Sequence, residues 1–390
     1  MILTKKQEEG LKIAVKRYKN KEKYTCISGY AGTGKSTLVK FIIQALGIPE
    51  DKVCYATFTG KAAQVLLKKG NKNVLTLHRL LFESFPKPDG TFYRKPVIDI
   101  YEDIVIVDEV SMAPKSLIQQ LFKYNVHVIC LGDPFQLPPV DKDEDNGLLA
   151  HPHIFLDEIM RQAQESEIIR LTMDIRAGKP IMYNNKGKEA LILKKNELNT
   201  GMLQWADQIL VGTNATRVGI NNQMRELMGR GTKPEDGDKI ICLRNYWDVL
   251  AENADPLVNG TIGYINNSFD SFVQIPRYLG GGQISTIEGN FISDSDANFG
   301  NLSMDTKMIL TGEKCVNWKT AYKLNANPKT RGLLPLEFTY AYAITCHKSQ
   351  GSEWDKVLVL EERFPFDKTE HARWLYTACT RAADKLVLVR

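Results

Sequence analysis

Hydrophobic and polar positions along this chain form short β-prone runs followed by polar or glycine-rich segments. Such runs occur at residues 23–28, 104–107, 126–131 and 208–211. Residues 38–47 and 217–228 instead have the composition of helices. The run at 104–107, Ile-Val-Ile-Val, is apolar on both faces, as in a parallel strand that helices cover on both sides. The pattern predicts an α/β fold.

The first run leads into a glycine-rich loop and then into a helix. Residues 29–37 read Gly-Tyr-Ala-Gly-Thr-Gly-Lys-Ser-Thr, which matches the phosphate-binding pattern G-x-x-x-x-G-K-[ST] in its expected context. Loop N–H groups and the helix N-terminus attract phosphate oxygens, Lys35 neutralises the β- and γ-phosphates, and Ser36 offers a hydroxyl to Mg²⁺. The sequence therefore predicts an ATP site formed by Gly29, Gly32, Thr33, Gly34, Lys35, Ser36 and Thr37.

Two later runs end in side chains that suit the same site. Asp108 and Glu109 follow residues 104–107, and ligands of open α/β sheets bind at the carboxyl ends of the strands. We expect Asp108 to hold Mg²⁺ and Glu109 to polarise the attacking water. Gln136, in Gly-Asp-Pro-Phe-Gln-Leu-Pro-Pro after the third run, is a neutral amide suited to sensing the γ-phosphate.

These segments, GYAGTGKST, VIVDEVSM and LGDPFQLPPV, resemble the RecD-like and phage Dda-like branch of superfamily 1B helicases. The resemblance continues through LTKKQEEGL, TFTGKAA, YAITCHKSQGSE and YTACTRA. It implies that Gln7 reads adenine, that Gly351 and Glu353 lie at the nucleotide, and that Arg161 and Arg381 reach the γ-phosphate. The single-stranded DNA contacts that it implies are Thr57, Thr59, Lys61, Thr76, His78, Thr345, His347 and Lys348.

The two arginines have a chemical reason and a simpler rival. Phosphoryl transfer spreads negative charge over oxygens that a guanidinium stabilises, by a factor of about 10³–10⁵ in rate. A surface ion pair is the alternative for Arg161 and for Arg381. One departure from the family is that residues 56–61 read Ala-Thr-Phe-Thr-Gly-Lys, without the proline that many relatives carry before the second threonine.

The resemblance implies two RecA-like P-loop lobes, each with an insertion. The first lobe is expected at residues 1–81 and 100–165, and the second at 166–266 and 334–390. Residues 267–333 contain short β segments, a Gly280–Gly282 run and many Asn, Asp and Ser. Because this segment is much longer than ordinary loops of about 12–15 residues, we expect a folded insertion, in this family an SH3-like β-barrel.

The insertion in the first lobe, residues 82–99, contains Pro-Asp-Gly between aromatic residues and predicts a β-hairpin. The resemblance implies that this hairpin is the pin that separates the strands. Parting one base-pair step costs about 1.4 kcal/mol, and stacking one base on an aromatic ring returns about 1–3 kcal/mol. Phe92, Tyr93 or Phe85 could be the wedge, and we choose Phe92; the alternative is that the aromatic residues pack the hairpin onto its lobe.

Composition and charge set the remaining expectations. The chain has 390 residues, 43% hydrophobic and 25% charged, which excludes a disordered or coiled-coil chain. Its seven cysteines lie far apart, no apolar run spans a membrane, and no signal peptide is evident, so we expect a cytoplasmic protein of a bacterium or of a phage host. Residues 1–81 contain 16 Lys and Arg against five Asp and Glu, a net charge of +11 within an overall +5. This excess lies where the nucleotide and DNA contacts are predicted.

The leading hypothesis is an ATP- and Mg²⁺-dependent DNA helicase that acts as a monomer on single-stranded DNA and at junctions. Movement from 5′ to 3′ follows from the resemblance, and single-strand-binding or replication proteins are candidate partners. The alternatives are an RNA or RNA–DNA helicase and a nucleotide-dependent DNA-binding switch that does not unwind. Replication, recombination and repair all remain open as the biological process.

Overall fold

The computed structural model describes residues 3–86, 92–138, 142–160, 165–252, 256–279, 281–326, 330–365 and 367–390. The chain forms two compact units. The first contains residues 1–81, 97–214 and 344–390, and the second contains residues 82–96 and 215–343. Both units are drawn from separate stretches of sequence, so neither corresponds to one continuous piece of the chain.

The first unit contains a six-stranded parallel sheet in the order β3-β2-β6-β7-β1-β8. Its strands are β1 (Tyr24–Gly29), β2 (Val53–Thr57), β3 (Val74–Thr76), β6 (Ile104–Val107), β7 (His127–Gly132) and β8 (Ile154–Leu156). The helices of this half are α1 (Lys5–Lys19), α2 (Lys35–Leu46), α3 (Gly60–Lys68), α4 (Leu77–Leu81) and α5 (Lys115–Leu121). Every residue of β6 is buried, as its apolar sequence predicts.

The core beneath this sheet explains how its central strands are held. Leu38 and Ile42 of α2 pack in one buried cluster with Ile27, Ile106 and Ile129 of the neighbouring strands. Because the strands are parallel and in register, the residues that follow β1, β6 and β7 lie along one edge. The phosphate loop and two strand-end carboxylates therefore meet there.

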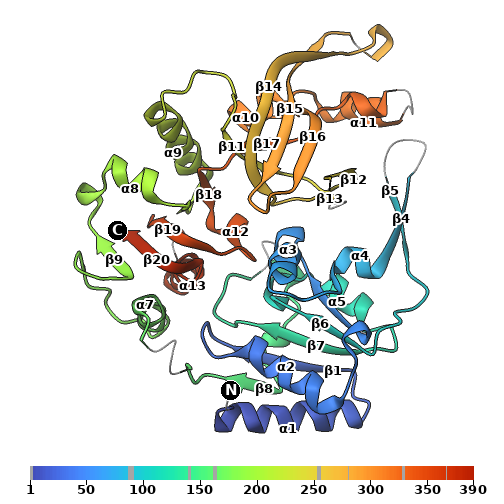
Figure 1. The fold of residues 1–390 in the computed structure, drawn as a ribbon, viewed down its shortest axis with the longest axis vertical. Helices are drawn as coiled ribbons and strands as arrows, with labels where there is room; N and C mark the ends of the chain where they lie inside the picture. The colour runs from blue at the N-terminus through green and yellow to red at the C-terminus, as the bar shows by residue number, and fades with distance from the viewer. Residues whose placement is uncertain are drawn as a thin grey trace. The chain divides into compact units, whose positions relative to one another are not determined.

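The first unit also contains a second sheet in the order β18-β10-β19-β20-β9. Its strands are β9 (Ala190–Leu193), β10 (Gln208–Val211), β18 (Ala343–Thr345), β19 (Trp354–Leu360) and β20 (Ala382–Val389) (Figure 1). The helices of this half are α7 (Glu167–Arg176), α8 (Thr200–Trp205), α12 (Cys346–Ser349) and α13 (Lys368–Cys379). The pairs β10–β19, β19–β20 and β20–β9 are parallel, which confirms the predicted α/β class with parallel sheets.

The second unit is built mainly from a five-stranded antiparallel sheet in the order β16-β15-β14-β11-β17. These strands are β11 (Lys239–Cys242), β14 (Ile262–Gln274), β15 (Gln283–Ser293), β16 (Asn298–Asp305) and β17 (Phe338–Tyr340). Two further pairs of strands are β12 (Tyr246–Leu250) with β13 (Pro256–Leu257), and β4 (Phe82–Pro86) with β5 (Phe92–Pro96). Its helices are α9 (Asn214–Leu227), α10 (Thr306–Thr311) and α11 (Trp318–Ala326). The β4–β5 pair is antiparallel and lies in the segment where the sequence predicts a hairpin.

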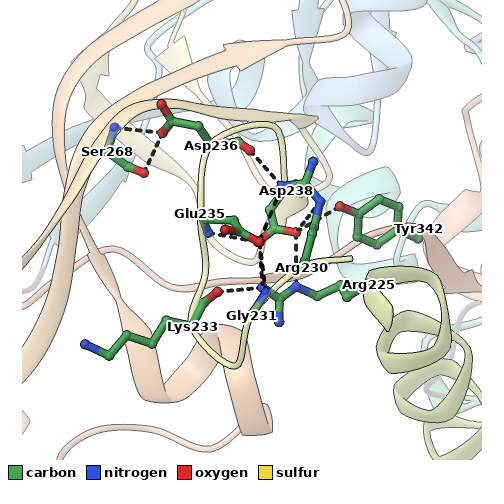
Figure 2. Close-up of polar contacts among 9 residues, drawn as sticks. All are labelled: Arg225, Arg230, Gly231, Lys233, Glu235, Asp236, Asp238, Ser268 and Tyr342. Carbon is green, nitrogen blue, oxygen red and sulfur yellow. Dashed lines mark hydrogen bonds and ion pairs between the residues drawn. The ribbon is translucent and has the colours of Figure 1, made fainter. Parts of the chain in front are cut away.

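A buried ionic network holds the loop between α9 and β11 (Figure 2). Asp238 has no exposed surface, and its Oδ1 accepts from Arg225 Nε at 3.1 Å and from the Tyr342 hydroxyl at 2.9 Å. Its Oδ2 accepts from the Glu235 backbone N–H at 2.9 Å. Asp236 in the same loop accepts from the backbone N–H of Ser268 at 2.8 Å, at the irregularity of β14. Side-chain bonds thus join α9, this loop, β14 and the segment before β18.

Two sequence expectations concern the chain as a whole. All seven cysteines are free thiols, and six of them are buried. Within the described ranges, no helix combines the length and the hydrophobicity that crossing a bilayer requires.

Candidate nucleotide-binding site

The glycine-rich loop has the geometry that its sequence predicts. Gly32 and Gly34 adopt φ angles of 76° and 78°, a region that favours glycine, and Gly34 immediately precedes α2. Lys35 begins the helix and its Nζ donates to the carbonyls of Gly29 at 2.7 Å and Tyr30 at 3.1 Å. The ammonium group therefore lies over the loop, where phosphate oxygens would replace the two carbonyls as acceptors.

Gln7 is buried against this loop from α1. Its Nε2 donates to the Thr33 carbonyl at 3.2 Å, and its Oε1 accepts from the Thr4 backbone N–H at 3.0 Å, within a capping box. A Cβ placed on Gly34 would lie 2.5 Å from Gln7 Nε2, so this position has no room for a side chain. The predicted role of Gln7 in reading adenine remains a prediction, and the structure adds a contact with the phosphate loop.

The strand β6 delivers the two acids at its carboxyl end. Asp108 is half-buried, and its desolvation, followed by repulsion from Glu109, raises the pKa of Asp108 to about 6. Its Oδ1 accepts from the Glu109 backbone N–H at 3.0 Å. Glu109 adopts φ 51°, ψ 47°, a left-handed conformation that costs about 1–2 kcal/mol for a residue other than glycine. The raised pKa of Asp108 and the strained backbone of Glu109 are both features that occur often at functional sites.

Gln136 connects Glu109 to Arg381. We orient the amide by its neighbours: Nε2 then donates to Glu109 Oε2 at 3.1 Å, and Oε1 accepts from Arg381 Nη2 at 3.2 Å. Arg381 is itself buried, and its Nε donates to the Thr377 carbonyl at 3.1 Å. The proposed base, the amide and the arginine thus form one hydrogen-bonded row between the two sheets of the first unit.

A small cavity lies beside this row. It has a volume of about 130 Å³, and its lining includes Asp108, Glu109, Gly351, Glu353 and Arg381. Gly351 has a φ of 74°, and a Cβ there would come within 2.8 Å of Ala62. The cavity therefore brings Gly351 and Glu353, which the resemblance places at the nucleotide, next to Asp108 and Glu109 at the end of β6.

Sequence reasoning assigned no role to Asp133 or to Tyr376. The Tyr376 hydroxyl of α13 donates to Asp133 Oδ2 at 2.5 Å and accepts from the Ala31 backbone N–H of the phosphate loop at 3.0 Å. Asp133 is almost fully buried, and burial raises the pKa of its carboxyl. Asp133 directly follows β7, so the reasoning that selected Asp108, a polar residue at the carboxyl end of a parallel strand, also applies to Asp133. No residue near Tyr376 in the sequence indicates that its hydroxyl bonds to Asp133.

Arg176 is a second residue that the sequence did not indicate. Its guanidinium lies 3.5 Å from the centroid of the Tyr30 ring in the phosphate loop, and Phe155 meets the same ring edge-on at 5.4 Å. A cation of α7 therefore lies against the loop that is predicted to bind the triphosphate.

The residues predicted to contact DNA occupy the ends of strands and the helices that follow them. Thr57 Oγ1 donates to the Thr59 carbonyl at 2.8 Å, Thr59 caps α3, and Thr76 Oγ1 accepts from the Arg79 backbone N–H at 3.3 Å. These hydroxyls hold the turns in which they lie. The other predicted contacts in this half are Lys61 in α3 and His78 in α4, whose ring lies 6.1 Å from that of Phe58.

In the second half, Thr345 ends β18, and α12 contains His347 and Lys348. Burial lowers the pKa of His347, which favours a neutral imidazole. Arg161 lies outside the described residues, and so does the side chain of Phe92, although the backbone of Phe92 belongs to β5. Contact of all these residues with nucleic acid or nucleotide remains a prediction.

The fold and the site define a class: a P-loop protein with two parallel α/β sheets and a nucleotide site built from residues of both. Two family models match the chain, an AAA domain over residues 3–193 and a UvrD-like helicase C-terminal domain over residues 340–389. The crystal structure of a Pif1 helicase from Bacteroides in complex with ADP-AlF3 and ssDNA shares the fold, with a TM-score of 0.55 at 17% identity, covering 100% of this chain and 92% of that one. This similarity supports two RecA-like lobes.

Two sequence relatives narrow the class. The chain is 27% identical over 380 residues to the ATP-dependent RecD2 DNA helicase of Deinococcus radiodurans, covering 92% of this chain and 46% of the relative. It is 31% identical over 190 residues to the ATP-dependent DNA helicase dda of Enterobacteria phage T4, covering 45% of this chain and 43% of the relative. The two family models and these two relatives together support a helicase of superfamily 1B. It spans less than half the length of either relative.

Proposed function

We propose that this protein is an ATP-dependent DNA helicase that moves from 5′ to 3′ on single-stranded DNA and unwinds duplex DNA. The observation that carries the proposal is the row from Glu109 through Gln136 to Arg381. It joins a candidate base at the end of β6 to an arginine that follows α13, beside the phosphate loop. A protein that only binds nucleotide has no need of this alignment. The names of the RecD2 and dda relatives, both ATP-dependent DNA helicases, point the same way.

In the proposed reaction Glu109 accepts a proton from the water that attacks the γ-phosphate, and Lys35 and Arg381 stabilise the charge on the transferring group. Gln136 bonds to both Glu109 and Arg381, so it senses whether the γ-phosphate holds the arginine. Hydrolysis would release Arg381 from the phosphate and let the two lobes separate. This coupling converts each ATP into movement along the strand. The predicted second arginine, Arg161, would add to the same charge stabilisation.

The residues present suit Mg²⁺ in this reaction. Ser36 offers a hydroxyl and Asp108 a carboxylate, the oxygen donors that this ion prefers. The structure contains no group of three or more His, Cys, Asp or Glu side chains suited to holding a metal among its described residues, so the protein would supply few ligands. Such sites use phosphate oxygens and waters for the rest, and the bound ion neutralises charge on the β- and γ-phosphates. Burial of Asp108 beside Glu109 favours a cation there.

The finer architecture is part of the proposal. Residues 82–99, which contain the β4–β5 pair, would act as the pin, and residues 267–333 as an SH3-like insertion of the second lobe. The lobes would be residues 1–81 with 100–165, and 166–266 with 334–390. DNA would cross Thr57, Thr59, Lys61, Thr76 and His78 in the first lobe, then Thr345, His347 and Lys348 in the second.

The first test is the ATPase activity of the protein with and without single-stranded DNA. We expect DNA to stimulate hydrolysis and Lys35→Ala to abolish it. Lys40→Ala is the matched control because Lys40 lies on the exposed side of the same helix, and it should hydrolyse ATP like the unaltered protein. Hydrolysis that no polynucleotide stimulates would contradict a motor function.

The second test is strand displacement from duplexes with a 5′ or a 3′ single-stranded tail, made in DNA and in RNA. The proposal requires unwinding of the 5′-tailed DNA. Unwinding of RNA alone, or DNA-stimulated hydrolysis without unwinding, would favour an RNA helicase or a switch instead. Phe92→Ala should reduce unwinding far more than ATPase activity, and equal loss of both would show that Phe92 is not the wedge.

A further inference from the structure

A large pocket lies in the first unit, apart from the nucleotide site. Its volume is about 560 Å³, which is in the range of ligand sites. It is lined by residues that follow β9, β19 and β20 and by residues at the start of α13: Lys195, Glu361, Glu362, Arg363, Pro365, Lys368, His371 and Arg390. Figure 1 shows β9, β19 and β20, which are parallel neighbours in one sheet. Because the lining residues follow these strands, the pocket lies at their carboxyl ends, where ligands bind in open α/β sheets.

The two acids of the pocket are already bonded to the protein. Glu362 Oε2 accepts from the backbone N–H groups of Gly212 at 2.5 Å and Thr213 at 3.0 Å, and its Oε1 accepts from Thr213 Oγ1 at 3.0 Å. Glu361 pairs with His371 Nε2 at 2.9 Å and with Arg390 Nε at 3.0 Å. The bond to Glu361 raises the pKa of His371, which favours the charged imidazolium. Glu361 is therefore paired with two cations of the wall, whereas Glu362 is held by neutral donors at the end of β10.

Three other cations of the pocket, unlike His371 and Arg390, are not paired with a glutamate. Lys195, Arg363 and Lys368 are exposed, and none of them makes a side-chain hydrogen bond or ion pair with any residue that the structure describes. Lys195 follows β9, whereas Arg363 and Lys368 lie between the end of β19 and the first residue of α13, and all three line the same pocket. Together with Arg390 these cations outnumber the two glutamates of the pocket, so the wall carries a net positive charge that attracts anions.

The position of the pocket indicates which anion this is. Glu362, in its wall, bonds to Thr213 at the end of β10, and β10 lies next to β18, which ends at the predicted DNA contact Thr345. Adjacent strands are about 4.8 Å apart. The near wall at β19 is therefore about 10 Å from β18, and β9 about 19 Å. The cations themselves extend over about 10 Å, from β19 to β9, which suits two consecutive phosphates better than one small anion.

We propose that this pocket binds consecutive phosphates of single-stranded DNA as an extension of the predicted track over the second lobe, an inference that rests on the proposed DNA-tracking function. Lys195, Arg363 and Lys368 supply the charge, with Arg363 able to hold one phosphate through two N–H groups. Glu361 and Glu362 position the wall by fixing His371, Arg390 and the end of β10. These residues contact the phosphates of the DNA backbone, so the contact has no preference for a base sequence.

The test measures binding of single-stranded oligonucleotides of increasing length as a function of salt. A triple variant, Lys195→Gln with Arg363→Gln and Lys368→Gln, is compared with the control Lys186→Gln, Lys188→Gln and Lys356→Gln. The control removes the same charge before β9 and at the start of β19, away from the carboxyl ends of the strands. Each phosphate contact contributes about 0.7 to the slope of log K against log salt. We expect the slope to fall by about 2 in the triple variant, for the longer oligonucleotides only, and to be unchanged in the control.

The outcomes separate this inference from the proposed function. If the unaltered protein does not bind single-stranded DNA, the proposed function itself fails. If it binds and is stimulated by DNA while the triple variant keeps the full salt slope at every length, the pocket is not part of the track. The last measurement is binding of pyrophosphate in competition with DNA. If the triple variant loses pyrophosphate binding but keeps the salt slope of DNA binding, the pocket binds a small free phosphate and the proposed contact with the DNA backbone is wrong.

Discussion

The buried carboxylate of Asp238 offers the sharpest test of how the second unit is held together. Asp238→Ala removes a charge that has no exposed surface and that accepts from Arg225, Tyr342 and the Glu235 backbone (Figure 2). Arg230 Nε lies 3.5 Å from Asp238 Oδ1, the oxygen that accepts from Arg225 and Tyr342. The substitution therefore removes the closer of the two carboxylates that Arg225 and Arg230 share, and leaves them with Glu235, whose Oε1 lies 3.9 Å from Arg225 and 4.0 Å from Arg230.

The expected cost follows from this burial. Breaking a buried ion pair by removing one partner costs about 3–5 kcal/mol, because the remaining charge stays buried and uncompensated. The Arg225 side chain is only 7% exposed, so water cannot take the place of the carboxylate. Asp238→Asn keeps an acceptor but loses the charge. We expect it to cost about 2 kcal/mol, from weakened bonds to Arg225 and Tyr342.

The matched control is the exposed pair of Lys233 with Asp270, whose side chains are 65% and 58% exposed. Asp270→Ala should cost at most about 1 kcal/mol, since solvent screens that pair. The double variant Asp238→Ala with Arg225→Ala should cost less than the sum of its parts, because it removes the orphaned charge as well.

Hydrogen exchange read out by peptide, along a urea series, suits a chain of two units for which a single unfolding transition is not assured. Loss of protection should appear in α9, β11 and β17. A cost for Asp238→Ala as small as that of Asp270→Ala would refute the reasoning, and so would full additivity with Arg225→Ala.

Two further predictions concern the nucleotide site. Because desolvation raises the pKa of Asp108 to about 6 in the folded protein, its ionisation opposes folding increasingly between about pH 4 and pH 6 and fully above pH 6, so Asp108→Asn should raise the unfolding free energy without Mg²⁺ by up to about 3 kcal/mol at pH 8. Calorimetry should show this gain shrinking towards pH 5, where the native carboxyl is protonated, and a gain that is equal at both pH values would contradict it. For the same reason the Mg²⁺ concentration that half-saturates ATPase activity should rise as the pH falls through about 6, and a constant value would argue against Asp108 as a ligand. Tyr376→Phe removes the bonds to Asp133 and to the Ala31 N–H and should raise KM for ATP about tenfold, in line with a cost of about 1–2 kcal/mol. Tyr124→Phe, which loses bonds to the Val97 carbonyl and to Gln120 but none to the phosphate loop, should leave KM unchanged, and an equal KM in the two variants would exclude Tyr376 as a positioning residue.

Local pattern and chemistry predicted the parts of this protein whose determinants lie within a few residues of one another. The loop at residues 29–37 requires glycines, a lysine and a hydroxyl in one short run, and φ angles near 77° at Gly32 and Gly34 follow from that run. The strand at residues 104–107 needs only four apolar residues, and Asp108 follows from its end. These predictions succeed because the turn of a glycine loop and the burial of a short apolar run depend on the residues within them.

The contacts that the sequence did not indicate join residues far apart in the chain. The Tyr376 hydroxyl meets the Ala31 N–H across 345 positions and Asp133 across 243. Arg176 reaches Tyr30 in the same way, and no spacing or charge pattern specifies either pair. Each arises only when two sheets, each predictable by itself, are placed against each other. This placement also explains why such contacts concern function: α13 carries Tyr376 and leads to Arg381, so one helix both holds the phosphate loop and presents the arginine to it. Any movement of the second sheet that follows hydrolysis must therefore change the hydrogen bonds of the loop that binds the nucleotide, and Tyr376→Phe would weaken that link without removing a charged group.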